Sequence, residues 1–241
     1  MLHKTRGIIF KTTDYSESSV IVQIFTEKFG LQSYMINGVK KSRAKIRQNS
    51  LQPLHLVDLV VYHKPTGNIQ RISELRQSPV FQTIPYNVIK SSLVMFLNEV
   101  LYKAIREQSA DEILFEYMYH SIELLDRMID GTANFHLYFL LRLTRFLGFY
   151  PDKTAASSSE FFDLQSGAFI NYQPSHSFIL QGPYTLLWRA LLDSSFENLS
   201  RIDITAGQRK FLLEKLLDYY RLHIDNFGEI RSHKILKEVL S

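Results

Sequence analysis

The stretch that decides the fold is RGIIFKTTDYSESSVIVQIFTEKFGLQSYMING, residues 6–38, where β-branched runs alternate with turn residues. Two more such runs, HLVDLVVYHK (55–64) and NIQRISELR (68–76), flank the turn KPTG. Short runs of this kind, bounded by turn residues, predict five strands of a small barrel or sandwich. Gly30 and Gly67 fit hairpin turns that require positive φ. The length suits an OB-fold, a five-stranded barrel that holds single-stranded nucleic acid.

The most charged segment is KKSRAKIR, residues 40–47, which has five cations and no acid. Each Lys or Arg that displaces a counterion from nucleic acid adds affinity that falls as salt rises. A solvated loop that only aids solubility is the alternative. We expect this loop and the neighbouring first strand to hold phosphates, through Lys40, Lys41, Arg43, Lys45, Arg47, Arg6 and Lys11. Tyr15, Tyr34 and Tyr62 would stack on bases if they face the open side of the barrel, although strand tyrosines also pack in cores.

The positive charge is concentrated at one end of the chain. Residues 1–80 carry twelve Lys and Arg against five acids, whereas the remaining residues carry sixteen against nineteen. This asymmetry predicts a polyanionic partner for the first part of the chain.

Composition excludes several classes of protein. With 241 residues, 45% of them apolar and 22% charged, the chain is long enough for one large or two modest globular domains. It contains no cysteine, which excludes disulfides, thiol catalysis and thiolate metal sites. The N-terminus lacks the apolar core of a secretory signal, and no stretch approaches the roughly 18 apolar residues of a spanning helix. We therefore expect a cytoplasmic protein.

The apolar period becomes helical after Pro79. Residues 88–105 place Ile89, Leu93 and Phe96 on one stripe, and residues 110–129 repeat the spacing up to Gly131. Three further helices are predicted at 134–149, 183–193 and 206–224, the first ending at Gly148 before Pro151. Residues 152–182 have neither period and predict a loop or small appendage. The predicted fold class is α+β, with an OB-fold domain at 1–79 and an all-helical domain at 80–241.

Four parts of the chain, the first of them in two stretches, resemble the RecO family of bacterial recombination mediators. Residues 6–30 and 37–54 (NGVKKSRAKIRQNSLQPL) resemble the start of that family, and residues 96–126 its first helical pair. The segment RLTRFLGFYPD, at 142–152, is similar to its central helix. The last segment, 219–240, looks like its C-terminal signature. The four segments occur in the family's order.

This resemblance implies a non-enzymatic DNA-repair protein without a cofactor, located in the bacterial cytoplasm at the nucleoid. Members of the family bind single- and double-stranded DNA and anneal complementary strands. They partner with RecR, contact the acidic tail of the single-strand-binding protein, and help to load RecA. The resemblance does not indicate which DNA form is preferred, the stoichiometry with RecR or the oligomeric state.

The tail of the single-strand-binding protein needs an apolar pocket with a cationic rim. We expect that pocket on the helical domain, beside Leu141, Phe146 and Phe149. Its predicted cations are Lys103, Arg106, Arg142 and Arg145. The alternative is that these cations form ordinary surface ion pairs with Glu99, Glu107 or Glu116.

Many relatives carry four zinc-binding cysteines in the region that corresponds to residues 152–176. Here Ala, Ser, Asn and Pro take those places, and His176 is the only His or Cys of the segment. A tetrahedral zinc site needs four donors, so no metal is expected. We expect the turn at 162–169 to be held by aromatic packing of Phe161, Phe162, Phe169 and Tyr172.

Enzymatic sites have little support in the sequence. His120 lies one helical turn from Glu116 and Glu123, and His136 has acids nearby, which is the spacing of a metal or general-base site. The chain has no HExxH motif, no phosphate-binding glycine loop and no nucleophile elbow. We predict no catalytic residue. A second hypothesis is a protein-interaction scaffold whose basic loop contacts an acidic protein.

Overall fold

The computed structural model describes residues 1–64, 67–106, 109–154 and 159–240, and its contacts divide the chain into two compact units. The first unit comprises Met1–Asn87 and Val94–Arg127, and the second comprises Val88–Leu93 and Met128–Ser241. The helix α2 (Glu112–Arg127) and most of α1 (Val88–Ala104) therefore group with the N-terminal strands. We describe each unit by itself.

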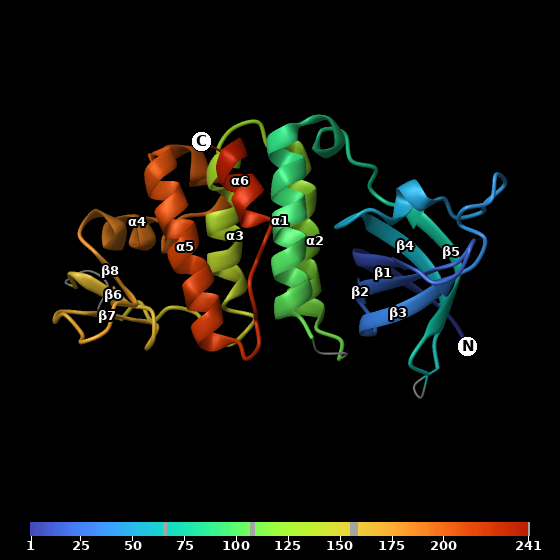
Figure 1. The fold of residues 1–241 in the computed structure, drawn as a ribbon, viewed down its shortest axis with the longest axis horizontal. Helices are drawn as coiled ribbons and strands as arrows, with labels where there is room; N and C mark the ends of the chain where they lie inside the picture. The colour runs from blue at the N-terminus through green and yellow to red at the C-terminus, as the bar shows by residue number, and fades with distance from the viewer. Residues whose placement is uncertain (65–66, 107–108, 155–158, 241) are drawn as a thin grey trace. The chain divides into compact units, whose positions relative to one another are not determined.

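The first unit contains a closed five-stranded barrel, drawn in blue to cyan in Figure 1. Its strands are β1 (Leu2–Asp14), β2 (Val20–Thr26), β3 (Gly30–Ile36), β4 (Leu56–Tyr62) and β5 (Gln70–Gln77). They follow the order β1-β2-β3-β5-β4, and β4 pairs with β1 to close the barrel. Only the pair β3–β5 is parallel. The predicted OB-fold barrel is confirmed.

The barrel interior is filled by alternate residues of the strands, as a period of two requires. Ile9, Val22, Ile24, Val57 and Leu59 are all buried there. Gly7 lies on β1 where a Cβ atom would come within 2.6 Å of Cγ2 of Ile24, so this position has no room for a side chain.

Of the two predicted turn glycines, only one has positive φ. Gly30 has a φ of 62°, as the turn between β2 and β3 requires. Gly67 lies in the hairpin connection between the antiparallel strands β4 and β5, as predicted, but without a positive φ. Its backbone N–H donates to the carbonyl of Lys64, and Gln70 bonds the carbonyls of both residues. A side chain thus holds this turn instead of a glycine conformation.

The helix α2 packs on the barrel through aromatic rings. Phe115 of α2 lies 6.1 Å from Phe25 of β2, and Phe25 in turn stacks on Phe10 of β1. At the start of α2, Asp111 Oδ1 accepts a 2.9 Å hydrogen bond from the N–H of Leu114 and so caps the helix. The helix therefore contacts the barrel through Phe115, which lies outside the apolar stripe predicted for 110–129.

The second unit is mostly helical, with α3 (Phe135–Leu143), α4 (Pro183–Leu192), α5 (Ala206–His223) and α6 (His233–Val239). The helix α3 is shorter than predicted, because residues 144–148 form turns that end at Gly148 with a φ of 85°. The helix α6 was not predicted. Trp188, Tyr219 and Tyr220 form the aromatic centre of this unit.

The described part of the chain also has short 3₁₀ helices in both units, at Gln48–Leu51, Ile84–Tyr86, Thr132–Asn134 and Phe196–Arg201.

The region predicted as a loop or small appendage, 152–182, contains a three-stranded sheet in the order β7-β6-β8. Its strands are β6 (Phe161–Asp163), β7 (Ala168–Ile170) and β8 (Ile179–Gln181). The strands of this insert were not predicted, because strands of three residues are too short to show a period.

The turn of this small sheet is held partly by polar bonds. Asp163 accepts 2.8 Å hydrogen bonds from the N–H of Gln165 and the hydroxyl of Ser166. Phe162 and Phe169 pack together as predicted, with ring centroids 4.9 Å apart. Tyr172 is 68% exposed, so its predicted packing role was wrong.

No helix in the described part of the chain is long and apolar enough to cross a membrane.

Candidate nucleic-acid interface

The basic segment 40–47 lies in the loop between β3 and the 3₁₀ helix at Gln48–Leu51. Val39 and Ile46 are buried in the barrel core and anchor the loop before Lys40 and before Arg47. Two backbone hydrogen bonds, from Lys41 to Gly38 and from Ala44 to Lys41, form successive turns between these anchors. The loop is therefore a defined platform that directs its polar side chains outward.

The five loop cations differ in their partners. Lys40 lies 2.9 Å from Asp14, and Nζ of Lys45 lies 3.4 Å from the carbonyl of Ser73. Lys41, Arg43 and Arg47 are exposed, and within the described residues no carboxylate pairs with them. These three side chains are the ones placed to meet a phosphate backbone.

Arg6 is held inside the first unit by two carboxylates. Its guanidinium donates to both oxygens of Glu27 at 3.1 and 2.9 Å and to the carboxylate of Glu116 on α2. It also lies 5.2 Å from the ring of Phe115 and 4.9 Å from that of Tyr119. The bond with Glu27 raises the pKa of Arg6 despite partial burial. The geometry therefore supports a structural role for Arg6, with its charge already balanced.

Lys11, the other predicted contact on β1, remains exposed. Its Nζ lies 4.9 Å from the ring centroid of Tyr102 on α1 and 3.4 Å from the hydroxyl of that residue. Lys11 pairs in register with Gln23 of β2, next to a bulge in β1. It thus lies at the side of the barrel where β2 and α1 meet.

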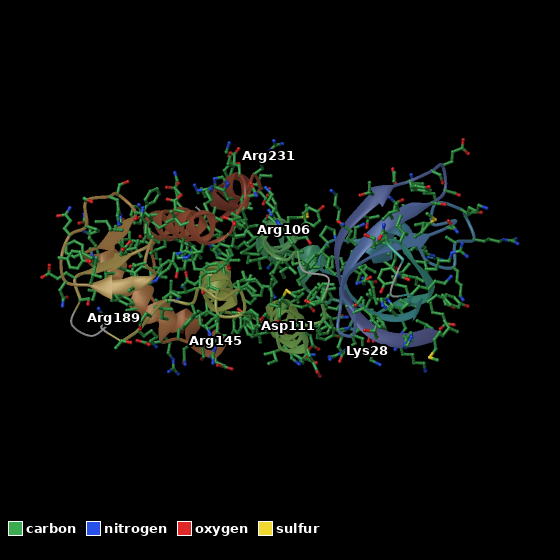
Figure 2. All side chains as sticks on the ribbon, turned by 90° about the horizontal axis from the view of Figure 1, so that it is seen from below. Lys28, Arg106, Asp111, Arg145, Arg189 and Arg231 are labelled. Carbon is green, nitrogen blue, oxygen red and sulfur yellow. The ribbon has the colours of Figure 1, made fainter. Side chains whose placement is uncertain are left out.

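A hollow of about 890 Å³ lies at this side of the barrel. Strands β2 and β3 contribute polar side chains, and the segment that ends α1 contributes Tyr102, Lys103 and Arg106, the last labelled in Figure 2. This hollow was not predicted from the sequence. The available signal was the polar positions Gln23, Gln32 and Ser33 within otherwise apolar strands; their proximity to α1 depends on the tertiary fold.

A second hollow, of about 770 Å³, lies next to Lys45. Three carboxylates line it, those of Glu27, Asp58 and Glu74. Five cations also line it, and two of them neutralise carboxylates, Arg6 that of Glu27 and Arg76 that of Asp58.

The three tyrosines proposed to stack on bases lie in different environments. Tyr34 is fully buried in the barrel, and this desolvation raises its pKa to about 12. It cannot stack on a base, and that prediction was wrong. Tyr15 and Tyr62 are 60% and 46% exposed. Tyr62 lies in register with Arg71 of β5 on the outer face of the barrel.

The four cations predicted for partner binding fall in both units. Lys103 forms an ion pair with Glu99 at 3.2 Å, as the surface-pair alternative proposed, and Arg106 bonds the carbonyl of Lys103. In the second unit, Arg142 donates to the hydroxyl of Tyr150 at 3.1 Å, and Arg145 is exposed on the turn after α3 (Figure 2).

The apolar residues expected beside Arg142 and Arg145 are only partly accessible. Leu141 is fully buried, and Phe149 stacks on His223 with ring centroids 5.1 Å apart. Phe146 and Tyr150 are half-buried and are the apolar groups that a partner could reach.

The histidines weighed for catalysis have ordinary structural surroundings. His120 lies on the surface of α2, with Nε2 3.0 Å from Glu116 and Nδ1 3.5 Å from Glu123. His136 is fully buried, and desolvation lowers its pKa to about 3, so that it stays neutral. Among the described residues, no three His, Asp or Glu side chains converge on a point where a metal ion would bind.

Two family models and several known proteins match this chain over most of its length. The family model described as recombination protein O N terminal matches residues 1–79, and the model for the recombination protein O C terminal matches residues 86–231. The chain belongs to the RecO family. The DNA repair protein RecO of Azobacteroides pseudotrichonymphae is 36% identical over 239 residues, which cover 99% of both chains. The RecO proteins of Phocaeicola vulgatus and Flavobacterium psychrophilum are 34% and 36% identical, with 100% and 99% of both chains covered.

The RecO relatives are DNA repair proteins by name, and the two family models together span the barrel and most of the helical part of this chain. The resemblance stated for four separate sequence segments is thereby confirmed over the whole chain. The individual DNA and partner contacts remain predictions.

Proposed function

We propose that this RecO-family protein is a recombination mediator that binds DNA through the basic loop of its barrel and anneals complementary strands. With RecR, it would load RecA onto single-stranded DNA coated by the single-strand-binding protein. It would act at the bacterial nucleoid, in the cytoplasm, by binding and without catalysing a reaction.

One observation carries the DNA-binding part of this proposal. Lys41, Arg43 and Arg47 are exposed on a loop that Val39 and Ile46 anchor in the barrel core. An anchored loop loses little conformational entropy on binding, so more of the phosphate attraction becomes affinity. Arg6 is left out of this site because its charge is balanced by Glu27 and Glu116.

The loop is tested by measuring oligonucleotide affinity as a function of salt. The triple variant Lys41→Gln, Arg43→Gln and Arg47→Gln should lower the slope of log K against log salt by about two units on single-stranded DNA, if each cation meets one phosphate. The matched control is Arg201→Gln, Lys210→Gln and Lys234→Gln, which removes the same charge from exposed positions of the second unit. An unchanged slope in the loop variant together with a reduced slope in the control would place the DNA site in the second unit.

The mediator step is tested separately. RecA ATPase activity on single-stranded DNA is delayed when the single-strand-binding protein covers that DNA. We expect the wild-type protein with RecR to shorten the delay and the loop variant to shorten it less. If neither protein affects the delay while both bind RecR, the scaffold hypothesis is favoured over the mediator.

A further inference from the structure

The small sheet of the second unit leaves one of its edges open beside a large hollow. We propose that an extended, uncharged peptide segment of a partner protein binds there and adds a strand to β8. This inference concerns a protein partner of the small sheet and does not depend on the proposed DNA binding by the barrel.

The register of β8 shows that the backbone groups on its outer side are available. The N–H of Leu164, which follows β6, donates to the carbonyl of Phe178 at 2.9 Å, in register with the pairs of β6 and β8. Bonded and non-bonded pairs alternate along antiparallel strands, so Leu180 is the next residue of β8 that bonds to β6. Ile179 and Gln181 therefore direct their N–H and C=O groups away from β6. Among the described strands, none pairs with this side of β8.

The opposite edge of the sheet is closed by the chain itself. Asp152 forms a parallel bridge with Ala168 of β7, and its N–H donates to the carbonyl of Gly167 at 2.8 Å. The strand β8, in contrast, reads Ile-Leu-Gln and contains neither proline nor a charged residue. Proline and charge are the usual features that prevent a free edge from pairing. The edge of β8 is therefore the one that a further strand can extend.

A hollow of about 1240 Å³ is lined by both Ile179 and Gln181. This volume exceeds the roughly 300–1,000 Å³ of sites for small molecules and is suited to a peptide. The helix α4, which follows β8 directly (Figure 1), contributes Tyr184 and the 61% exposed Leu186. The ring of Tyr184 lies 4.0 Å from that of Phe211 on α5. These apolar groups can contact alternate side chains of an added strand, which is the source of specificity in this mode of binding.

The charges around the hollow favour an uncharged occupant. Among its described lining residues are one carboxylate and one cation, Glu160 and Lys215, and Nζ of Lys215 lies 3.2 Å from the carbonyl of Ser177. His176 also lines the hollow, with Nε2 3.4 Å from Asp163. Its Nδ1 is buried and has no hydrogen-bond partner within the described residues, so it is available to accept a bond from a peptide N–H. Because these charges balance, the hollow does not attract nucleic acid or an acidic tail.

The probe for the test is obtained by selecting a library of short random peptides on the full chain. We expect the enriched peptides to be uncharged and rich in β-branched and aromatic residues. The variant Gln181→Pro lacks the outward N–H and should bind them about fivefold or more weakly. Gln181→Ala loses the same side chain but keeps that N–H, so it is the matched control and should bind normally. N-methylation of alternate residues in the selected peptides should likewise weaken their binding to the wild-type protein. Fluorescence anisotropy measures each affinity.

Each result decides the inference. A selection that enriches no peptide, or only acidic peptides, would overturn it. Normal binding by Gln181→Pro would also overturn it, provided that thermal melting shows this variant to be folded. If the variant is unfolded, the N-methylated peptides decide, because they leave the protein unchanged. A wild-type chain that is dimeric by light scattering, with a monomeric Gln181→Pro variant, would overturn the inference in favour of a second copy at this edge. Oligonucleotide binding should be unchanged in both variants, so a negative result here leaves the proposed function intact.

Discussion

Arg6 on β1 and Glu27 in the turn between β2 and β3 form a two-bond ion pair, with nitrogen–oxygen distances of 3.1 and 2.9 Å. Glu116 of α2 binds the same guanidinium, which also lies over the rings of Phe115 and Tyr119. One arginine therefore joins two strands of the barrel to the helix that covers it. A charge that sequence reasoning assigned to DNA is used within the fold.

Replacement of Arg6 should accordingly affect stability more than DNA binding. Arg6→Gln leaves Glu27 and Glu116 without their shared cation, and we expect a loss of about 1–3 kcal/mol in the free energy of unfolding. Arg71→Gln, at an exposed cation of β5, should change it by less than about 0.5 kcal/mol. Both are measured by chemical denaturation. A reduced salt slope for DNA binding with unchanged stability in Arg6→Gln would restore Arg6 to the DNA site.

Asp126 should make the first unit sensitive to acid. Its carboxylate accepts hydrogen bonds of 2.8, 2.9 and 2.8 Å from the N–H groups of Gln82, Thr83 and Ile84. Burial alone would raise the pKa of Asp126, but these bonds outweigh it and hold the pKa below its ordinary value. Because the folded pKa is the lower one, the stabilisation is complete above the unfolded pKa of about 3.9 and is lost as pH falls through the folded pKa.

The corresponding variant is Asp126→Ala, which leaves three N–H groups without their acceptor. We expect it to lower the free energy of unfolding by about 2–3 kcal/mol at pH 7. The difference from the wild type should shrink as pH falls below about 4, because the carboxylate is then protonated in the unfolded state and, at still lower pH, in the native state. Asp130→Ala, at an exposed position, is the control. A difference that is constant from pH 7 to pH 3 would show that the carboxylate charge contributes nothing.

Most helices and strands of this fold could be predicted from local sequence patterns. The contacts of the candidate site could not, because they join residues that are far apart in the sequence. Alternation in β2 and β3 is a local property, and it also contained the signal that Tyr34 faces inward, because Tyr34 is two residues from the buried Ile36. The ion pair of Arg6 joins residues 110 positions apart, and no pattern of a single sequence encodes it. The hollow likewise combines Gln32 with Arg106.

The basic loop was predictable for a different reason. Its five cations fall within eight residues and so share one loop in any fold, and Val39 and Ile46 are the apolar residues that precede Lys40 and Arg47. The sequence could not indicate that Lys40 pairs with Asp14, since Asp14 lies at the end of another strand. The clustering of cations can thus be predicted from the sequence. Which of them form ion pairs within the protein cannot.

The small sheet at 161–181 should not depend on metal. Asp163 holds its turn through hydrogen bonds from Gln165 and Ser166. We expect a chelator to leave the thermal unfolding midpoint unchanged and Asp163→Ala to lower it. Asp225→Ala, at an exposed position of the same unit, should have little effect. Stoichiometric zinc in the purified protein, found by elemental analysis, would contradict this prediction.

The last prediction concerns the acidic tail of the single-strand-binding protein. Arg142 and Arg145 lie on α3 and the turn after it, next in sequence to the half-buried Phe146 and close to Tyr150. Cations beside accessible apolar groups fit a peptide that ends in acidic and then apolar residues. We propose that this pair, rather than Lys103 and Arg106, forms the rim, because Lys103 is paired with Glu99 and Arg106 lines the hollow of the barrel.

Charge reversal separates these two possibilities. The double variant Arg142→Glu and Arg145→Glu should weaken binding of a tail peptide by about tenfold or more, because like charges then face each other across the interface. It should leave oligonucleotide binding by the barrel nearly unchanged. Arg201→Glu with Lys210→Glu gives the same change in net charge at other exposed positions of the unit and controls for long-range repulsion. Calorimetric titration measures the peptide affinity. Normal affinity in the Arg142 and Arg145 variant, with a loss in Lys103→Glu and Arg106→Glu, would move the tail site to the first unit.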